Sequence, residues 1–219
     1  MSVIEVTKLN KAYENKIIFH DFSMSVEEGE MLAICGESGC GKTTLLNIIG
    51  LLENFDSGDV VVQGHKNVKP NSREATQLLR ESISYLFQNF ALVEDETVKF
   101  NLMLALHYVE ASGQEKDEQI RQALASVGLE GYEDKRIYHL SGGEQQRVAI
   151  ARCLLKPSDI ILADEPTGNL DSKMGAEVME LLHKLNKEDG RTIVMVTHNE
   201  EQAKQTSRTI RFFDGRQVM

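Results

Sequence analysis

The sequence predicts an α/β domain with an antiparallel β part near its N-terminus and a helical lobe inserted in its middle. Three observations support this class. The first residues alternate apolar and polar side chains, short buried-strand patterns alternate with helical patterns at both ends, and the middle contains helical patterns alone. We expect one domain over residues 1–219, with residues 1–88 and 157–219 as the core and residues 89–156 as the helical subdomain.

Composition supports a globular domain and argues against several function classes. The 219 residues are 41% hydrophobic and 26% charged, which is typical of a soluble domain with a sizeable core. The net charge of −10 makes a nucleic-acid partner a poor expectation. No apolar run approaches the roughly 20 residues that span a bilayer, and Met1–Val6 does not resemble a signal peptide. We therefore expect a location in the cytoplasm.

The first predicted elements are two strands of an antiparallel sheet, followed by a strand, a loop and a helix. Val3–Val6 and Phe22–Val26 alternate like strands of an antiparallel sheet, and Glu28–Glu30 reads as a turn. The apolar run Met31–Cys35 predicts a buried strand that leads into glycine-rich residues. A helix is then expected over Thr43–Leu51.

The rest of the core and the lobe follow from the same patterns. Strand, helix and strand are expected at Val60–Val62, Ser72–Arg80 and Ile83–Phe87, and lobe helices at Val98–Tyr108 and Asp117–Val127. Further helices are expected at Gly142–Leu155, where Ser141 is the N-cap, at Lys173–Lys187 and at Asn199–Thr206. Buried strands are expected at Ile160–Ala163 and Thr192–Thr197. The last predicted element is a hairpin of Thr209–Phe213 and Arg216–Val218 with an Asp214-Gly215 turn.

The loop between the buried strand and its helix fits a phosphate-binding loop. Its glycines let successive backbone N–H groups point at phosphate oxygens ahead of a helix N-terminus. Lys42 supplies a positive charge for the β- and γ-phosphates, and the Thr43 hydroxyl is suited to ligate Mg²⁺. The candidate nucleotide-binding residues here are Gly36, Glu37, Ser38, Gly39, Cys40, Gly41, Lys42, Thr43 and Thr44.

Two acidic residues follow the strand at Ile160–Ala163. The strand should carry Asp164 to the edge of the sheet where it reaches Mg²⁺, with water between them. Strand alternation should point Glu165 elsewhere, toward a water that attacks the γ-phosphate, as a general base or a water-orienting group. The alternative is a solvated acidic turn before Pro166.

A second anion-binding pattern occurs at Ser141, Gly142 and Gly143, because their N–H groups lie at the N-terminus of a predicted helix. By itself it would be an ordinary N-cap followed by flexible glycines.

The three cysteines have no metal-ligand spacing: Cys35 and Cys153 fit small buried residues. Cys40 lies within the phosphate loop, where a redox switch is an alternative to simple tolerance of a small side chain.

The phosphate loop, the run Leu140–Arg147 and the segment Ile161–Pro166, in this order, resemble the ATP-binding cassette (ABC) ATPases over nearly the whole chain. The resemblance implies ATP and Mg²⁺ as ligands and a P-loop NTPase core. It also implies a head-to-tail dimer in which the Ser141–Gly143 segment of one copy completes the ATP site of the other.

The resemblance assigns four further positions. It implies that His198 contacts the γ-phosphate and that Gln88 touches Mg²⁺ and the attacking water. It places Asp171 in a loop that crosses the dimer interface and stacks Tyr13 on adenine. Catalytic candidates are therefore Glu165, His198, Gln88, Lys42, Ser141 and Asp171, and metal candidates are Thr43, Gln88 and Asp164.

Within that family, the segment Ala163–Asp171 resembles the lipoprotein-release and macrolide-export group, and Phe87–Glu94 is most similar to the bacteriocin-export branch. This implies an integral membrane permease as partner, docked near residues 89–101, and a peripheral position on the cytoplasmic side of the membrane. The expected role is to power export or extraction of a peptide, bacteriocin, lipoprotein or drug-like substrate. The alternatives are a nucleotide-gated regulator of a membrane protein, as in cell division, a soluble cassette for DNA repair or ribosome work, and a small-molecule kinase.

Overall fold

The structure is a computed structural model and describes residues 1–14, 16–213 and 216–218. Its elements in chain order are β1 (Ser2–Tyr13), β2 (Lys16–Glu27), β3 (Met31–Gly36), α1 (Lys42–Ile49), β4 (Ser57–Val62), β5 (His65–Lys66), α2 (Arg73–Glu81), β6 (Ile83–Leu86), α3 (Val98–Met103), α4 (Gly113–Ser126), a 3-10 turn (Ile137–His139), α5 (Gly142–Leu155), β7 (Ile160–Asp164), α6 (Ser172–Lys187), β8 (Thr192–Thr197), α7 (Glu200–Ala203), β9 (Arg208–Phe213) and β10 (Arg216–Val218).

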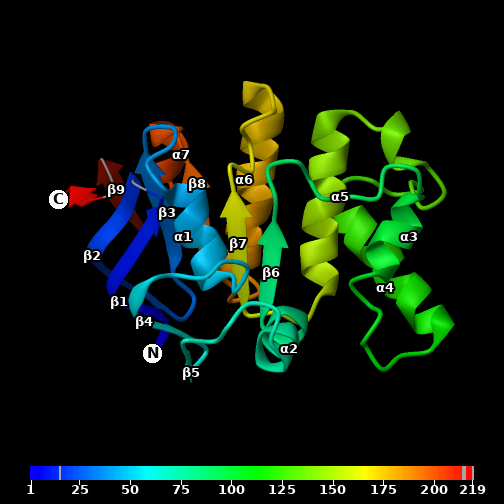
Figure 1. The fold of residues 1–219 in the computed structure, drawn as a ribbon. Coiled ribbons are helices and arrows are strands. Elements are labelled where there is room, and N and C mark those ends of the chain that lie inside the picture. Colours follow the sequence, from blue (N-terminus) through cyan, green and yellow to red (C-terminus); the bar gives the residue numbers. More distant parts are fainter. Residues whose placement is uncertain (15, 214–215, 219) are drawn as a thin grey trace.

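The strands of the described residues form two sheets (Figure 1). The first is antiparallel with the order β2-β1-β4-β5. The second has the order β10-β9-β3-β8-β7-β6, and its pairs are parallel except at the β9–β10 edge. The predicted α/β class with an N-terminal antiparallel part is therefore confirmed. Because β3, β7 and β8 are neighbours, the residues that follow them meet at one sheet edge.

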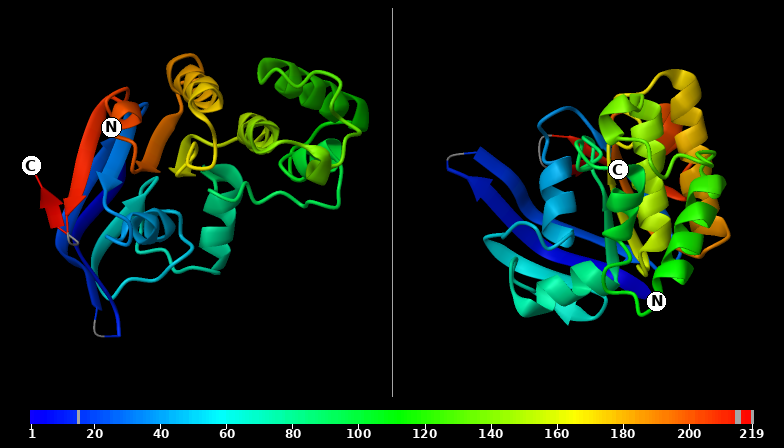
Figure 2. Two further views of the ribbon diagram at one scale, coloured as in Figure 1. Left: turned by 90° about the horizontal axis from the view of Figure 1, so that it is seen from above. Right: turned by 90° about the vertical axis from the view of Figure 1, so that its right-hand side faces the viewer.

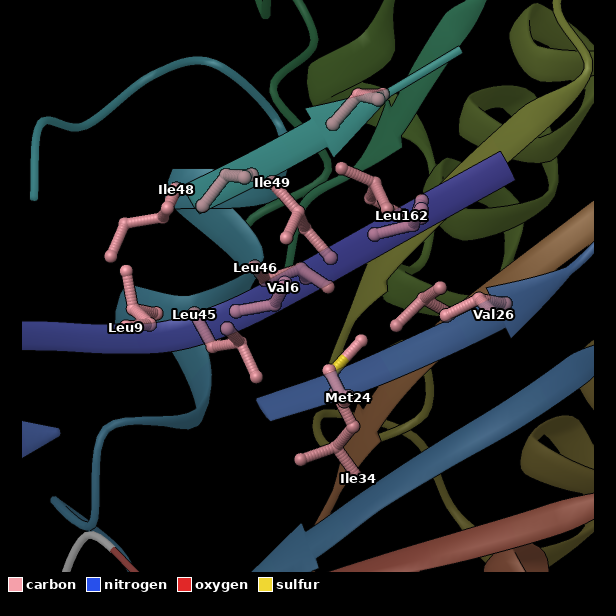
Figure 3. Packing of buried hydrophobic residues seen from close by; sticks show 14 of the residues in the cluster. Val6, Leu9, Met24, Val26, Ile34, Leu45, Leu46, Ile48, Ile49 and Leu162 are labelled. Atoms are coloured by element: carbon pink, nitrogen blue, oxygen red, sulfur yellow. The ribbon is translucent and has the colours of Figure 1, made fainter. Parts of the chain in front are cut away.

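The first apolar core holds α1 in place beneath the antiparallel sheet. β1 and β2 pair with Val6 opposite Met24, and their inward side chains face α1 (Figure 3). Leu45 and Leu46 of α1 are fully buried in this cluster. Burial of such side chains contributes about 1.5–3 kcal/mol each. The helix that begins at the phosphate loop is short, so this packing, and not its intrinsic helix stability, holds it in place.

The second core covers the other face of the parallel sheet and includes the lobe. It joins sheet residues such as Ala33 and Ile161 to lobe residues such as Leu102 and Leu124 in one buried cluster. Figure 2 shows the helices α3 and α4 at the far end of the molecule from the antiparallel sheet. The lobe thus shares its core with the sheet, and the boundaries at residues 88 and 157 remain a prediction. Among the described residues, no helix has the length and apolar character needed to cross a membrane.

Several predicted elements differ in their bounds. The first two strands are longer than expected, since β1 covers Ser2–Tyr13 rather than Val3–Val6 and β2 covers Lys16–Glu27 rather than Phe22–Val26. The helix expected over Val98–Tyr108 ends at Met103, because the hydrogen bonds then shift to an i→i−3 pattern that buries Leu106 and exposes Leu104. The lobe helix expected from Asp117 begins at Gly113, behind a capping box that the sequence motif S-x-x-E indicates. The helix expected over Asn199–Thr206 covers only Glu200–Ala203. The predicted Asp214-Gly215 turn lies outside the described residues.

Candidate nucleotide-binding and hydrolysis site

The loop between β3 and α1 has the backbone shape of an anion cradle. Gly39 and Gly41 both have positive φ, at 77° and 103°. A Cβ on Gly41 would lie 2.5 Å from Ile18 Cγ2, so this position requires glycine for space as well as for its backbone conformation. The N-terminus of α1 has no side-chain cap. Its first N–H groups are therefore free for an anion such as phosphate.

Lys42 and Thr43 are the first two residues of α1 and face this loop. The Lys42 side chain is buried, and its Nζ donates to the carbonyls of Gly36 at 2.8 Å and Glu37 at 2.9 Å. The loop thus keeps the charged amine inside the cradle without a carboxylate partner among the described residues. The cationic end of this side chain is positioned to be shared with a bound phosphate.

Asp164 lies next to Thr43, at the end of β7. The Thr43 Oγ1 donates to Asp164 Oδ1 at 3.2 Å, which brings together two of the three predicted metal ligands. Burial raises the pKa of Asp164, and the hydrogen bond from Thr43 opposes this shift. A divalent cation would offset the cost of burying this charge. A hydroxyl and one carboxylate also fit Mg²⁺, which completes its shell with water and phosphate oxygens.

Glu165 and His198 form a contact across neighbouring strands. Glu165 Oε2 lies 2.9 Å from His198 Nδ1 and 3.4 Å from the His198 backbone nitrogen. Glu165 has a φ of 45°, so it leaves the strand in a left-handed conformation. The expectation that strand alternation sets its direction was therefore wrong, because β7 ends at Asp164. A turn held by tertiary contacts aims the carboxylate instead.

One cleft of about 670 Å³ gathers residues from distant parts of the sequence. It is lined by Tyr13, Lys16, Ile18, Ser38, Gly39, Gly41, Lys42, Thr43, Thr44, Gln88, Glu165 and His198. Sequence reasoning missed Lys16 and Ile18, which belong to no phosphate-loop motif. The pairing of β2 with β1 brings them there, and Lys16 Nζ donates to the Gly39 carbonyl at 3.3 Å. The only sequence signal was a cation on the strand after Tyr13.

Tyr13 lies at the mouth of this cleft. Its side chain is 44% exposed, and its hydroxyl donates to Glu53. Lys11 Nζ lies 4.5 Å from the centre of the Tyr13 ring and 3.0 Å from Glu53 Oε1. Burial and the hydrogen bond to Glu53 raise the pKa of the Tyr13 hydroxyl. The ring is thus held at a defined place, as a stacking platform requires.

The Ser141–Gly143 segment does not line the cleft. Ser141 is exposed as the N-cap of α5, and a Cβ on Gly142 would approach Phe90 and Leu170 no closer than 3.9 Å. Asp171 also lies outside, where its carboxylate accepts the N–H groups of Lys173 and Met174 as the N-cap of α6. Ser141, Gly142 and Asp171 are therefore exposed, whereas Gly143 is buried against Met174, and none of the four lines the cleft with its own phosphate loop.

A comparison with known families shows to which family the chain belongs. A family described as "ABC transporter" matches residues 19–168. The chain belongs to the ABC transporter family. The matched part runs from the first sheet through the loop after β3 and α5 to the turn after Glu165, so it includes most of the residues that line the cleft and the Ser141–Gly143 segment.

Individual relatives agree with this family. The chain is 41% identical to a macrolide export ATP-binding/permease protein of Neisseria meningitidis serogroup A, over 98% of its own length and 34% of that protein. It is 39% identical to the ABC transporter ATP-binding protein YxdL of Bacillus subtilis, over 98% of its own length and 84% of that protein. It thus spans about a third of the macrolide-export relative and most of the second.

Solved ABC cassettes have the same fold. A dimeric structure of the bacterial cassette MJ0796 superimposes with a TM-score of 0.90 at 38% identity and covers 99% of this chain and 97% of that one. A dimeric post-hydrolysis state of the same cassette, bound to ADP and Pi, gives a TM-score of 0.89 at 37% identity, with coverages of 98% and 97%. The predicted ABC ATPase fold is confirmed.

Proposed function

We propose that this ABC ATPase hydrolyses ATP to ADP and phosphate and thereby powers export or extraction of a substrate through a membrane permease. The observation that carries this proposal is the shared cleft, in which Lys42, Thr43 and Gln88 meet the Glu165–His198 pair. A nucleotide held by the loop would place its γ-phosphate between the cation of Lys42 and the carboxylate of Glu165.

The predicted site residues in and beside this cleft then have roles that their chemistry suits. Gly36 to Thr44 hold the phosphates, and Thr43, Asp164 and Gln88 hold Mg²⁺, which when bound neutralises phosphate charge. Glu165 accepts a proton from the attacking water or orients it. His198 donates Nδ1–H to Glu165, which fixes the carboxylate, and when the ring is protonated its Nε2–H would donate to the γ-phosphate. Tyr13 stacks on adenine.

A second copy of the chain completes the site. The Ser141–Gly143 segment, in which Ser141 and Gly142 are exposed, has helix N–H groups suited to an anion, yet it does not line its own chain's cleft. A head-to-tail dimer brings it to the γ-phosphate of the other copy. Asp171 and Asn169 belong to the loop that crosses this interface, and Asn169 Nδ2 already donates to the Gln88 carbonyl at 3.2 Å. The dimeric cassettes of similar structure support this arrangement.

The permease is expected on a groove of about 760 Å³ beside Gln88. Exposed apolar side chains line it, including Leu52, Leu104 and Tyr108, and residues 89–101 begin beside it. An apolar groove of this kind suits a short helix of a membrane subunit. The chain would then be peripheral on the cytoplasmic side of the membrane. The substrate class is a peptide, bacteriocin, lipoprotein or drug-like molecule.

The test is isolation of the Glu165→Gln form from its native membranes with ATP and mild detergent, followed by identification of its partners. A multi-spanning permease with a large extracytoplasmic domain is the expected result and would indicate the substrate class. A small division-type membrane protein would replace transport by a regulatory role. Soluble or nucleic-acid partners alone would overturn the proposal. Lys42→Ala, which should not retain ATP, is the matched control.

A further inference from the structure

In the proposed dimer, Ser141 of one copy completes the ATP site of the other, and we call this the two-copy site. Within its own chain, the Ser141 hydroxyl is held by a carboxylate of the same helix. Glu144 Oε2 accepts from both the Ser141 backbone nitrogen and the Ser141 Oγ, each at 2.8 Å. In return, Ser141 Oγ accepts from the Glu144 backbone nitrogen at 3.3 Å. The hydroxyl has a single proton, so it cannot donate to Glu144 and to a phosphate at the same time.

The carboxylate of Glu144 is fixed from both sides. Its Oε1 accepts from the Tyr132 hydroxyl at 2.8 Å, and Lys135 Nζ lies 3.2 Å from the centre of the Tyr132 ring. The N–H of Ser141 holds the pKa of Glu144 below its ordinary value, which desolvation only partly opposes. Glu144 therefore carries its full negative charge at neutral pH, next to the place where the partner's phosphate must arrive.

We propose that Glu144 is a positioning residue that opposes closure of the two-copy site by holding the Ser141 hydroxyl and by repelling the incoming phosphate. The proposal rests on the proposed function, in which Ser141 contacts the ATP of the other copy. Closure then requires Ser141 to exchange one acceptor for another. The charge of Glu144 thus weakens the ATP-bound dimer and favours its opening after hydrolysis.

The chain contains its own control for the ordinary structural role of this contact. Ser112 and Glu115 form the same capping box at the start of α4, with Glu115 Oε2 accepting from the Ser112 nitrogen at 2.7 Å. That box caps a different helix, and neither of its residues lines the nucleotide cleft or belongs to the Ser141–Gly143 segment. A glutamine can serve in either box as well as glutamate does. Glu→Gln therefore removes the charge and keeps the cap in both helices.

The experiment measures ATP-dependent dimerisation of the Glu165→Gln protein by sedimentation over a range of protein concentrations. Adding Glu144→Gln should lower the dimer dissociation constant about tenfold, which corresponds to ~1.4 kcal/mol. Adding Glu115→Gln should leave it unchanged. The gain from Glu144→Gln should shrink at 1 M salt, because added ions screen repulsion between charges. A purely structural role would not produce that salt dependence.

Two results would count against the inference in different ways. If the Glu165→Gln parent dimerises with ATP but Glu144→Gln leaves its dissociation constant equal or higher, Glu144 does not oppose closure and the two-copy site still stands. If the parent remains monomeric with ATP while binding the nucleotide, the two-copy site and the inference both fail. Binding of a fluorescent ATP analogue to the monomer should be the same in all variants.

Discussion

Glu165 Oε2 and His198 Nδ1 are 2.9 Å apart, although the two residues follow different strands and are 33 positions apart in the sequence. The Glu165 side chain is only 13% exposed and the His198 side chain 68%. The carboxylate is therefore the fixed member of the pair, and the imidazole is the one that remains open toward the cleft.

Replacing Glu165 by Gln should reduce ATP turnover about 10²–10⁴-fold, because an amide cannot accept the proton of the attacking water. Binding of ATP should persist, since the phosphate loop is untouched, and the ATP-bound dimer should accumulate. Phosphate release and sedimentation of the same sample measure both effects. Turnover at the parent rate would remove Glu165 from its assigned role.

Replacing Ser141 by Ala should lower turnover about 10²-fold, as expected when one donor to the transition-state charge is lost. Monomer binding of ATP should change little, because Ser141 does not line its own chain's cleft. Ser112→Ala is the matched control, since it removes an equivalent N-cap at a cost of about 1 kcal/mol without touching the site. A collapse of monomer binding in Ser141→Ala would contradict the two-copy site.

Gly142 and Gly143 should respond differently to alanine. A Cβ on Gly142 would meet only ordinary contacts at 3.9 Å or more, so folding stability should stay within about 0.5 kcal/mol of the parent. The added methyl group would instead face the second copy, so ATP-driven dimerisation and turnover should be lost. A Cβ on Gly143 would lie 2.3 Å from Met174 Sδ, so Gly143→Ala requires the Met174 side chain to move and should change the melting temperature more than Gly142→Ala does. Normal turnover in Gly142→Ala would show that the segment is not approached by a phosphate.

Asp164 should reduce the stability of the nucleotide-free protein. Because burial raises its pKa in the folded state, the folded chain holds the proton more tightly than the unfolded chain. Stability is therefore lost as pH rises from about 4, the ordinary value for an aspartate, through the raised value. Asp164→Asn removes this cost, so it should raise the melting temperature at pH 7 by roughly 2–4 °C for each 1 kcal/mol gained.

The check on Asp164 is thermal unfolding of parent and variant from pH 4 to pH 8 without nucleotide or metal. The melting temperatures should separate as pH rises. A variant that is less stable than the parent at pH 7 would show that the hydrogen bond from Thr43 outweighs the burial of the charge. ATP hydrolysis should be lost in the variant whichever way its stability moves, since the carboxylate is a proposed ligand of Mg²⁺.

Motif residues and buried runs were predictable because they depend on local physics. The apolar run before Gly36 had to be a buried strand, and the glycines after it had to form a loop ahead of a helix. Helix ends were less certain where packing decides them. Met103 ends α3 because Leu106 turns into the core, and no cap in the sequence marks that point. The hydrogen-bonded capping box at Ser112 did have a local signal.

The sequence by itself determined the phosphate loop, the Ser141 cap and the strand that ends at Asp164, because glycine freedom, capping chemistry and apolar periodicity act over a few residues. Only the tertiary structure decided the left-handed turn at Glu165, its contact with His198, and the place of Lys16 and Ile18 in the cleft. These depend on strand order and register, which join residues far apart in the chain. No local pattern contains that pairing, since its free energy comes from burying the two cores together.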